Sequence, residues 1–326
     1  MKILVTGATG ALGSRLVPLL TAAGHTVTGT TTTEAKTEQL RAAGAEPVVL
    51  DVLDAAAVRE AVADATPEVI VHEATALSHQ TDLGARELRR LDNVFATTNR
   101  LRSEGTDNLL AAAAGAGTRR FVAQSFAGWP YAREGGGVKT EEDPLDSHPP
   151  AGTEQCLAAI KHLEDAVTSA PGIEGIVLRY GGFYGPGTTI YPGGEQAEMV
   201  RRRLLPVVGN GEGVLSLIHI DDAAEATAAA VERGTPGIYN ITDDDPATQR
   251  EWLPRLAAAM GARPPRRVPV WLARFAAGRW LAMVMTEGRG AANDKAKREL
   301  GWQPGHPSWR EGFREVFAGQ PAQAAR

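Results

Sequence analysis

Three glycines near the start of the chain, Gly7, Gly10 and Gly13, have the spacing of a turn that binds phosphate groups. They lie between an apolar segment, residues 1–6, and a segment with helical apolar periodicity, residues 14–20. Glycine lets the backbone turn tightly and lets a ligand approach it closely. The first turn of the following helix offers N–H groups and a partial positive charge to a pyrophosphate. The sequence therefore predicts a strand, a phosphate-binding turn and a helix.

Strand and helix patterns alternate along the first two thirds of the chain. Short apolar runs rich in β-branched residues predict strands, and longer amphipathic segments between them predict helices. Repeated alternation indicates an α/β protein with a doubly wound parallel sheet and right-handed crossover connections. The expected strands are residues 1–6, 25–30, 46–51, 68–72, 119–124, 175–179, 214–220 and 237–242, and the expected helices are 14–20, 34–43, 54–63, 91–114, 153–169 and 221–232.

The alternating pattern weakens in the last part of the chain. Residues 181–213 are rich in Gly, Pro and Arg, which favours loops around one helix. From residue 246 onward only helices and turns are expected. We therefore expect two regions. A Rossmann-type dinucleotide-binding domain comprises 1–180 plus 214–245, and a smaller, mostly helical substrate-binding region comprises 181–213 plus 246–326.

The composition argues against several kinds of partner. The net charge of the 326-residue chain is −5 and no basic block is present, so no nucleic-acid partner is expected. No run reaches the roughly 20 apolar residues of a membrane span, and no signal peptide or membrane partner is expected. Cys156 is the single cysteine, so a cytoplasmic, reducing compartment is expected. No zinc-type spacing of Cys and His occurs, so no metal is expected.

Several motifs together resemble those of the extended short-chain dehydrogenase/reductase superfamily, the group of NAD-dependent epimerases and dehydratases. The resemblance covers nearly the whole chain, and it implies a Rossmann fold and a bound nicotinamide dinucleotide. The segments that carry it are Thr-Gly-Ala-Thr-Gly-Ala-Leu-Gly at 6–13, the strand end at 70–76, Gly-Thr-Asp-Asn-Leu-Leu at 105–110, and residues 178–187, 218–224 and 295–304.

The resemblance also implies which positions meet each part of the cofactor. The glycine turn would line the pyrophosphate, the end of the third strand would meet the adenine, and the residues after the fourth strand would lie along the ribose nearer the nicotinamide. Asp51 has an alternative function as a helix N-cap, although Asp54 is better placed for it. The implied positions are Gly7, Thr9, Gly10, Ala11, Leu12 and Gly13 in the turn, then Asp51 and Val52, and then Ala74, Thr75 and Ala76.

The residues after the second strand bear on the choice between NAD and NADP. NAD-binding folds usually carry an acidic residue about 20 positions after the glycine turn, where it binds ribose hydroxyls. Here that zone is four threonines, residues 30–33, which carry no charge to repel a ribose phosphate. The hydroxyls of Thr31 and Thr32 are suited to bind that phosphate, although no arginine follows to clamp it. NADP is therefore favoured over NAD.

The catalytic positions of the family are only partly retained. The resemblance implies a tyrosine acid/base, a lysine four residues later that holds the ribose, a Ser/Thr that polarises the substrate carbonyl, and a supporting asparagine. Lys161 matches the lysine, but Leu157 stands in the tyrosine position and has no proton to transfer. Phe126 stands in the Ser/Thr position, with Ser125 one residue earlier. Arg102 stands in the asparagine position, so the chain resembles an atypical member of the family.

Other polar side chains are candidates for the missing proton donor. Tyr131 lies in a loop that borders the substrate in the family, and we expect Tyr131 or Ser125 to act together with Lys161. Each candidate also has a structural alternative: packing a loop, lining a wall or facing solvent. The further candidates are Tyr180, Tyr184, Lys139, His162 and Arg102.

One more polar cluster, His219 with Asp221 and Asp222, is compatible with metal binding or acid–base chemistry. In the family that the chain resembles, this segment is a strand end followed by a helix. We therefore expect an aspartate to cap the helix and the histidine to fill the structure, with no metal site.

The function expected from these features is that of an NAD(P)-dependent oxidoreductase of the atypical extended short-chain type, acting on a small metabolite by hydride transfer. One alternative is an epimerase or dehydratase that uses the cofactor transiently. Another is a non-catalytic NADP(H)-binding sensor or scaffold. The expected partners are a small-molecule substrate and, by analogy with the family, a second copy of the chain that packs through helices 91–114 and 153–169.

Overall fold

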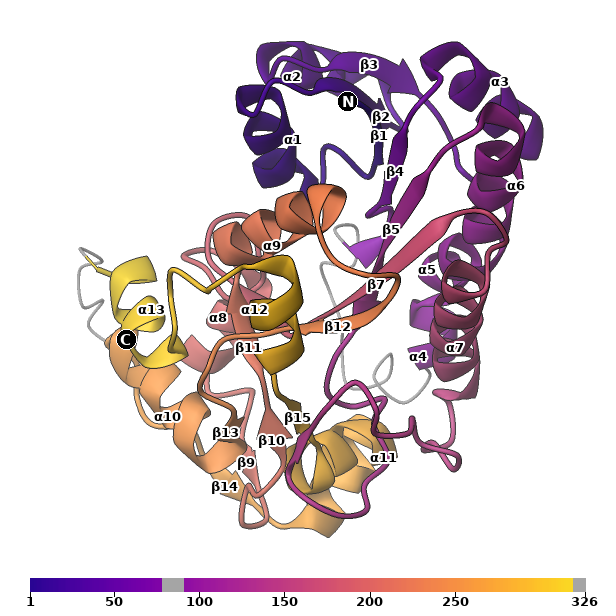
Figure 1. Ribbon diagram of the computed structural model, residues 1–326. Helices are drawn as coiled ribbons and strands as arrows, with labels where there is room; N and C mark the ends of the chain where they lie inside the picture. Colours follow the sequence, from indigo (N-terminus) through magenta and orange to yellow (C-terminus); the bar gives the residue numbers. More distant parts are fainter. Residues whose placement is uncertain (78–90, 319–326) are drawn as a thin grey trace.

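The computed structural model describes residues 1–77 and 91–318 (Figure 1); residues 78–90 and 319–326 of the two expected regions lie outside that description. Its centre is one seven-stranded sheet made of β1 (Lys2–Thr6), β2 (Thr26–Thr31), β3 (Glu46–Val49), β4 (Val69–His72), β5 (Arg120–Phe126), β7 (Glu174–Tyr180) and β12 (Gly237–Ile241). The strand order is β12-β7-β5-β4-β1-β2-β3, and every neighbouring pair is parallel. This order confirms the expected doubly wound α/β fold.

Helices cover both faces of the sheet (Figure 1). On one face, α1 (Gly13–Ala22) packs against α9 (Ile220–Glu232). On the other lie α3 (Ala55–Ala65), α6 (Thr106–Ala116) and α7 (Glu154–Thr168). Both faces are thus covered, and the continuous apolar runs of the strands follow from this burial.

The central strand β1 shows how the two cores are built. Ile3 and Val5 point into the core beside α1, where Leu16 is also buried, while Leu4 points into the core on the opposite face. Successive side chains of a strand alternate between faces, so one run of three apolar residues serves both cores. None of the three is more than 1% exposed. Each such buried side chain stabilises the fold by roughly 1.5–3 kcal/mol.

Two of the expected helices are interrupted. Residues 91–114 form α4 (Leu91–Val94), α5 (Ala96–Arg100), a π-helical turn η4 (Leu101–Gly105) and then α6. Residues 34–43 form a short 3₁₀ turn η1 (Glu34–Lys36) and α2 (Thr37–Ala42). A π turn inserts one residue into the helical repeat, which apolar periodicity does not reveal, and such turns often occur at functional sites.

The expected strand 214–220 is wrong in both extent and place. The chain divides at Ser216 into β10 (Val214–Leu215) and β11 (Leu217–His219), and neither belongs to the central sheet. The Ser216 hydroxyl donates to the Ala291 carbonyl and accepts from the Ala291 N–H, so it ties this point to the C-terminal part of the chain. β11 instead pairs in parallel with β8 (Gly182–Tyr184).

The remaining part of the chain is not only helices and turns, as the sequence suggested. Short strands β13 (Ala247–Thr248), β14 (Arg267–Val268) and β15 (Gly290–Ala291) pair with β10, β9 (Val207–Val208) and β6 (Val138–Lys139), respectively. Strands of two residues are too short to leave a periodic pattern. The helices of this part are α8 (Glu195–Arg201), α10 (Gln249–Ala259), α11 (Val270–Glu287), α12 (Asp294–Leu300) and α13 (Trp309–Val316).

A separate apolar core joins these C-terminal elements to residues 181–213. It contains Tyr184, Trp252, Trp309 and Phe313, all at most 4% exposed. The core draws on the same two stretches that the sequence assigned to a substrate-binding region, and we keep that division as a proposal. Among the helices of the described residues, none combines the length and apolarity needed to cross a membrane.

Candidate dinucleotide site

The turn between β1 and α1 requires glycine at two positions. Gly7 has a φ of 71°, and a Cβ on it would lie 2.5 Å from the carbonyl oxygen of Glu73. A Cβ on Gly13 would lie 2.3 Å from the carbonyl oxygen of Gly7. The turn is closed by a hydrogen bond of 2.9 Å from the Gly10 N–H to the Gly7 carbonyl. The turn therefore packs so closely against β4 and α1 that positions 7 and 13 have no room for a side chain.

This turn leaves backbone donors available for a ligand. Within the described residues, no acceptor takes up the N–H groups of Thr9, Ala11 and Leu12. No side chain caps the start of α1. A Cβ on Gly187, in the loop after β8, would lie 3.9 Å from the Cβ of Ala11, so this loop borders the turn. Unpartnered N–H groups at the start of a helix fit the phosphates of a dinucleotide.

The residues expected to meet the adenine end follow β2 and β3. Thr31 is buried, and its hydroxyl lies 3.3 Å from the Thr33 nitrogen, while Thr32 is exposed. A carboxylate oxygen of Asp51 accepts from the Leu53 N–H at 2.9 Å, and Val52 is buried beneath it. The N-cap of α3 is Asp54, as expected, since its carboxylate accepts from two N–H groups of the first turn. Because β1, β2 and β3 are parallel, these residues lie at one edge of the sheet.

The residues expected near the nicotinamide follow β4. Ala74, Thr75 and Ala76 are half-buried, and the Ala76 N–H donates to the Thr98 hydroxyl at 3.2 Å. Lys161, on α7, is half-buried, and its Nζ donates to the Asp146 carbonyl at 3.0 Å. In this conformation, therefore, the ammonium group is held by a loop carbonyl.

The two hydroxyls expected to replace the catalytic tyrosine lie in one buried charged network. Glu164 and Arg179 form its centre, through bonds of 2.8 and 2.6 Å. The Ser125 hydroxyl donates to Glu164 at 2.7 Å. The Tyr131 hydroxyl accepts from Arg179 at 3.1 Å and donates to Asn240 at 2.6 Å. Both hydroxyls thus have structural partners, and their catalytic function stays a prediction.

Burial adds a further obstacle to proton transfer by Tyr131. Its side chain is 1% exposed, and burial raises the pKa of its hydroxyl even though the Arg179 charge lowers it. Sequence patterns gave no reason to join Tyr131 to Asn240, because the two residues are 109 positions apart. The network links the loop after β5 to α7, β7 and β12.

Three of the other candidate proton donors contact residues away from the end of β4, although the buried Tyr184 hydroxyl has no hydrogen-bond partner among the described residues. Tyr184 is fully buried and packs against the rings of His219 and Phe313. Lys139 pairs with Asp143 at 3.1 Å. His162 forms an exposed pair with Asp107 at 2.8 Å. The structure therefore brings none of these three side chains to the residues that follow β4.

The polar cluster at residues 219–222 ties together two parts of the fold. His219 itself is the N-cap of α9, accepting from the Asp221 N–H at 3.3 Å, so the expectation that an aspartate caps this helix is wrong. Asp222 accepts from the N–H groups of Gly305 and His306 at 3.1 and 2.8 Å. The imidazole rings of His219 and His306 stack, with their centroids 3.9 Å apart. Possible metal-ligand atoms of His219, Asp222 and His306 lie within 4.8 Å of one another. The Asp222 carboxylate, however, already accepts hydrogen bonds from backbone N–H groups.

A glutamate that the sequence analysis did not single out lies beneath the glycine turn. Glu73 is 5% exposed; its Oε1 accepts from the Tyr180 hydroxyl at 3.1 Å, and its Oε2 has no partner among the described residues. Burial raises the pKa of Glu73 to about 8, although the Tyr180 hydrogen bond lowers it. An acidic residue directly after an apolar strand was the one available signal. The carboxyl group is therefore largely protonated at neutral pH.

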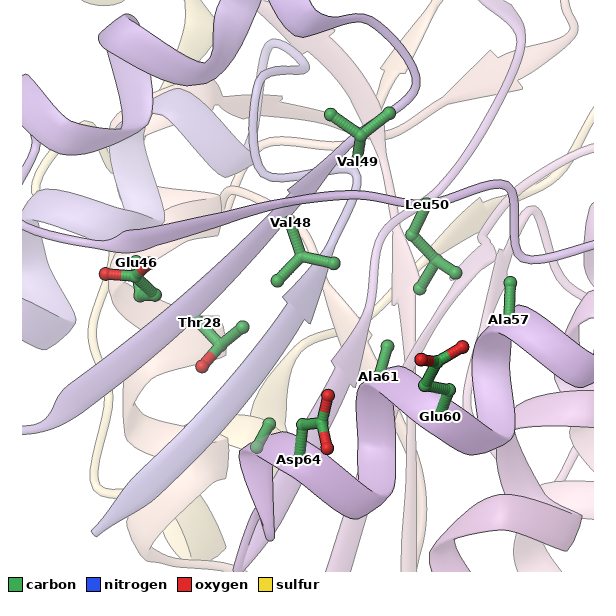
Figure 2. A pocket seen from close by; sticks show the side chains of 10 residues that line it. Thr28, Glu46, Val48, Val49, Leu50, Ala57, Glu60, Ala61 and Asp64 are labelled. Carbon is green, nitrogen blue, oxygen red and sulfur yellow. The ribbon is translucent and has the colours of Figure 1, made fainter.

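Figure 2 shows a pocket beside the outer strand of the sheet, between β3 and α3. Exposed carboxylates of Glu60 and Asp64 stand on its rim and would repel phosphate groups. None of the residues expected to bind the dinucleotide lines it. The residues that line it are Thr28, Glu46, Val48, Val49, Leu50, Ala57, Glu60, Ala61, Asp64 and Ala65.

Gly13→Ala tests whether the turn needs its missing side chain. We expect loss of NADPH affinity and roughly 2 kcal/mol or more of stability, because the new Cβ meets the Gly7 carbonyl. Calorimetric titration and thermal unfolding measure both effects. Gly115→Ala in α6 is the matched control, since a Cβ there meets nothing within 4 Å. The control should gain roughly 0.5–1 kcal/mol, and equal behaviour of the two variants would contradict the proposed packing.

Glu73→Gln tests the buried carboxyl group. A folded-state pKa of about 8, above the ordinary 4.5, means that the folded protein loses stability as the pH rises between these values. Glutamine mimics the protonated form, so it should raise stability on the order of 3 kcal/mol at about pH 9 and change little at about pH 5. Thermal unfolding at both pH values measures this. Glu60→Gln, at an exposed position of α3, should show no such pH dependence.

Comparisons with known proteins agree with this geometry. Residues 3–242 match the model of the NAD dependent epimerase/dehydratase family. A 3-diazoavenalumate denitrifying reductase from Streptomyces sp is 44% identical over 317 residues, which cover 96% of this chain and 99% of that protein. A 4-hydroxy-2-methyl-3-oxo-4-farnesyl-3,4-dihydroquinoline-1-oxide ketoreductase from Stigmatella aurantiaca is 27% identical and covers 99% of this chain and 97% of its own.

Solved structures agree in fold. UDP-glucose 4-epimerase from Thermus thermophilus in complex with NAD has a TM-score of 0.71 and 26% identity, with 98% of this chain and 99% of that chain covered. Human epimerase family protein SDR39U1 with NADPH has a TM-score of 0.73 and 21% identity, with 98% of this chain and 100% of that chain covered. The glycine turn, the parallel sheet and the family match lead to one conclusion: the chain belongs to the NAD dependent epimerase/dehydratase family, within the extended short-chain dehydrogenases/reductases.

Proposed function

We propose that this enzyme is an NADPH-dependent reductase that removes nitrogen from an aromatic diazo compound. The relative that is 44% identical over nearly the whole of both chains is named as a denitrifying reductase of a diazo compound. Simple alkyl diazonium ions decompose at once in water, whereas aryl diazonium ions persist, so we infer that the group is carried on an aromatic ring. The substrate is therefore a small aromatic molecule.

The observation that carries this proposal is the leucine at the acid position. Reduction of a carbonyl leaves a negative oxygen, and a positioned acid that protonates it contributes roughly 10²–10⁴ in rate. Leu157 lies one helical turn before Lys161 on α7 and is 2% exposed, so it has no proton to give. In denitrification a nicotinamide cofactor held here would supply hydride to the ring carbon, and N₂ would leave with the electron pair of the C–N bond. No oxygen becomes charged, so no acid is needed.

The chain's own residues then have binding functions. The N–H groups of Thr9, Ala11 and Leu12 are suited to hold the cofactor phosphates, and Lys161 is suited to hold the ribose after it leaves the Asp146 carbonyl. Leu157 presents an apolar surface in place of a hydroxyl, which keeps water from the reacting carbon. Water competes with hydride for the diazonium substrate and would give a phenol, so its exclusion favours the reduced product.

The adenine end decides the choice of cofactor in this proposal. The hydroxyls of Thr31 and Thr32 would receive the ribose phosphate of NADPH, and Asp51 and Val52 would meet the adenine. No acidic side chain stands among residues 30–33 to repel the phosphate. NADPH is therefore preferred to NADH.

The alternatives fit the site less well. An epimerase or dehydratase needs a group that moves a proton; Leu157 cannot, and the hydroxyls of Ser125 and Tyr131 are engaged in the buried network. A sensor without turnover would consume no NADPH with any substrate. We further propose that the enzyme is cytoplasmic and forms a homodimer whose two copies pack through α6 and α7. Net consumption of NADPH separates a reductase from an enzyme that uses its cofactor transiently.

The reaction is tested with 4-carboxybenzenediazonium that carries ¹⁵N in both nitrogen positions, and with NADPH deuterated at the transferred position. We expect one ¹⁵N₂ released for each NADPH oxidised, with the deuterium on the ring carbon that held nitrogen. Mass spectrometry measures both products, and a reaction without enzyme corrects for direct reduction. Oxidation of NADPH by ketones alone, with no enzyme-dependent release of nitrogen, would contradict the proposal.

Lys161→Ala tests the cofactor-holding function. We expect kcat/KM to fall by at least about tenfold, because the variant loses a charged hydrogen bond to the ribose. His162→Ala, at the adjacent exposed position, is the matched control and should stay within about twofold of the wild type, because its partner is the exposed Asp107. Unchanged activity of Lys161→Ala would remove this lysine from the site.

A further inference from the structure

One buried arginine lacks the partners that the other buried arginines have. Arg120 pairs with Glu174 and donates to backbone carbonyls, and Arg179 makes a two-pronged pair with Glu164. Arg102 is 9% exposed, yet no hydrogen bond or ion pair engages its guanidinium within residues 1–77 and 91–318. A buried charge without a partner is costly and calls for an explanation.

Arg102 lies where the expected nicotinamide end of the site meets α7. It belongs to the π-helical turn η4, whose Leu101 carbonyl accepts from the Nε2–H of His72 at the end of β4, at 3.1 Å. Burial and, to a smaller extent, the positive charge of Arg102 lower the pKa of His72 to about 4. The guanidinium therefore lies close enough to His72 to influence its charge. Charges on Cys156 and Glu164 of α7, in turn, raise the pKa of Arg102 against the effect of its burial. The helix α7 also carries Lys161.

Among residues 1–77 and 91–318, no acidic side chain forms an ion pair with this guanidinium. Both carboxylate oxygens of Glu164 already bind Arg179, and one of them also accepts from Ser125. The carboxylate of Asp92 accepts from the Cys156 N–H at 2.9 Å. Burial lowers the pKa of Arg102 to about 10, so the side chain is still charged at neutral pH. The positive charge is therefore left for a ligand.

A second polar group one turn earlier is also incomplete. Asn99 donates through Nδ2 to the Cys156 sulfur at 3.5 Å, but its buried Oδ1 has no partner among the described residues. A guanidinium donor and an amide acceptor thus remain unpartnered on the same stretch of helix. Buried polar groups in folded proteins are nearly always paired, so two such groups together indicate a place where a ligand or an ordered water completes them.

We propose that Arg102 binds a carboxylate group of the substrate. A guanidinium presents parallel N–H donors that match the two oxygens of a carboxylate. Together with Lys161, it would make the site repel a diazonium compound that carries only positive charge and favour one that also carries a carboxylate. The identity of the substrate as an aromatic diazo compound rests on the proposed function; the binding of a carboxylate by Arg102 does not.

The binding test needs no turnover. Enzyme saturated with NADP⁺ is titrated calorimetrically with 4-hydroxycinnamate and with 4-hydroxycinnamide, which lacks the charge. We expect wild type to prefer the acid, and Arg102→Gln to bind the acid at least about tenfold more weakly while its affinities for the amide and for NADP⁺ stay unchanged. Arg100→Gln, at an exposed position that pairs with Glu104, is the matched control and should behave as wild type.

Thermal unfolding of the same variants separates binding from a structural function. Arg102→Gln removes an unpaired buried charge, so its midpoint should rise, whereas loss of a structural residue would lower it. Arg102→Lys keeps the positive charge but lacks the two parallel N–H donors of the guanidinium, so it should recover only part of the preference for the acid. Equal affinity of wild type for acid and amide, an unchanged acid affinity in Arg102→Gln, or a fall in NADP⁺ affinity alone would overturn the proposal. Failure of nitrogen release in the labelled reaction, with these results intact, would overturn only the proposed function.

Discussion

The close contact between the β1–α1 turn and the end of β4 is the constraint on which the rest of the structure depends. Gly13 packs on the carbonyl of Gly7, and Gly7 packs on the carbonyl of Glu73, at distances that exclude any Cβ. This contact keeps side chains out of the turn, and no acceptor in the described part of the chain takes up the N–H groups of Thr9, Ala11 and Leu12. An NAD(P)-dependent oxidoreductase of the extended short-chain type is built around this turn, and the loop after β8 closes beside it.

The buried ionisable side chains divide into those that pair with one another and those that do not. The pair of Glu164 and Arg179, with the hydroxyls and amide that join it, fixes α7 against three strands of the sheet. Glu73, directly after β4, has one carboxyl oxygen without a partner among the described residues, and Arg102, on η4, has no hydrogen bond or ion pair among them. Of these unpaired groups, Arg102 is the one that we propose a ligand completes. Leu157 adds a buried apolar side chain at the position where the family has a proton-donating tyrosine.

Local patterns predicted the fold well, because parallel strands, caps and the glycine turn each leave a signal within a few residues. The sheet and the Asp54 cap are examples. Three features left no such signal. A π-helical turn changes the helical repeat by a single residue, the strand at 214–220 is diverted at Ser216 by a contact 75 positions away, and Tyr131 meets Asn240 across 109 positions. The burial of a charged side chain depends on the packing of several distant elements, so Glu73 was not anticipated.

The most direct test of this account is a calorimetric titration of the purified protein with NADPH and with NADH, followed by a crystal structure of the complex. The account predicts one binding site per chain, tighter for NADPH, with the phosphates on the N–H groups of Thr9, Ala11 and Leu12. No heat of binding with either nucleotide at millimolar concentration, or a nucleotide bound away from the glycine turn, would contradict it.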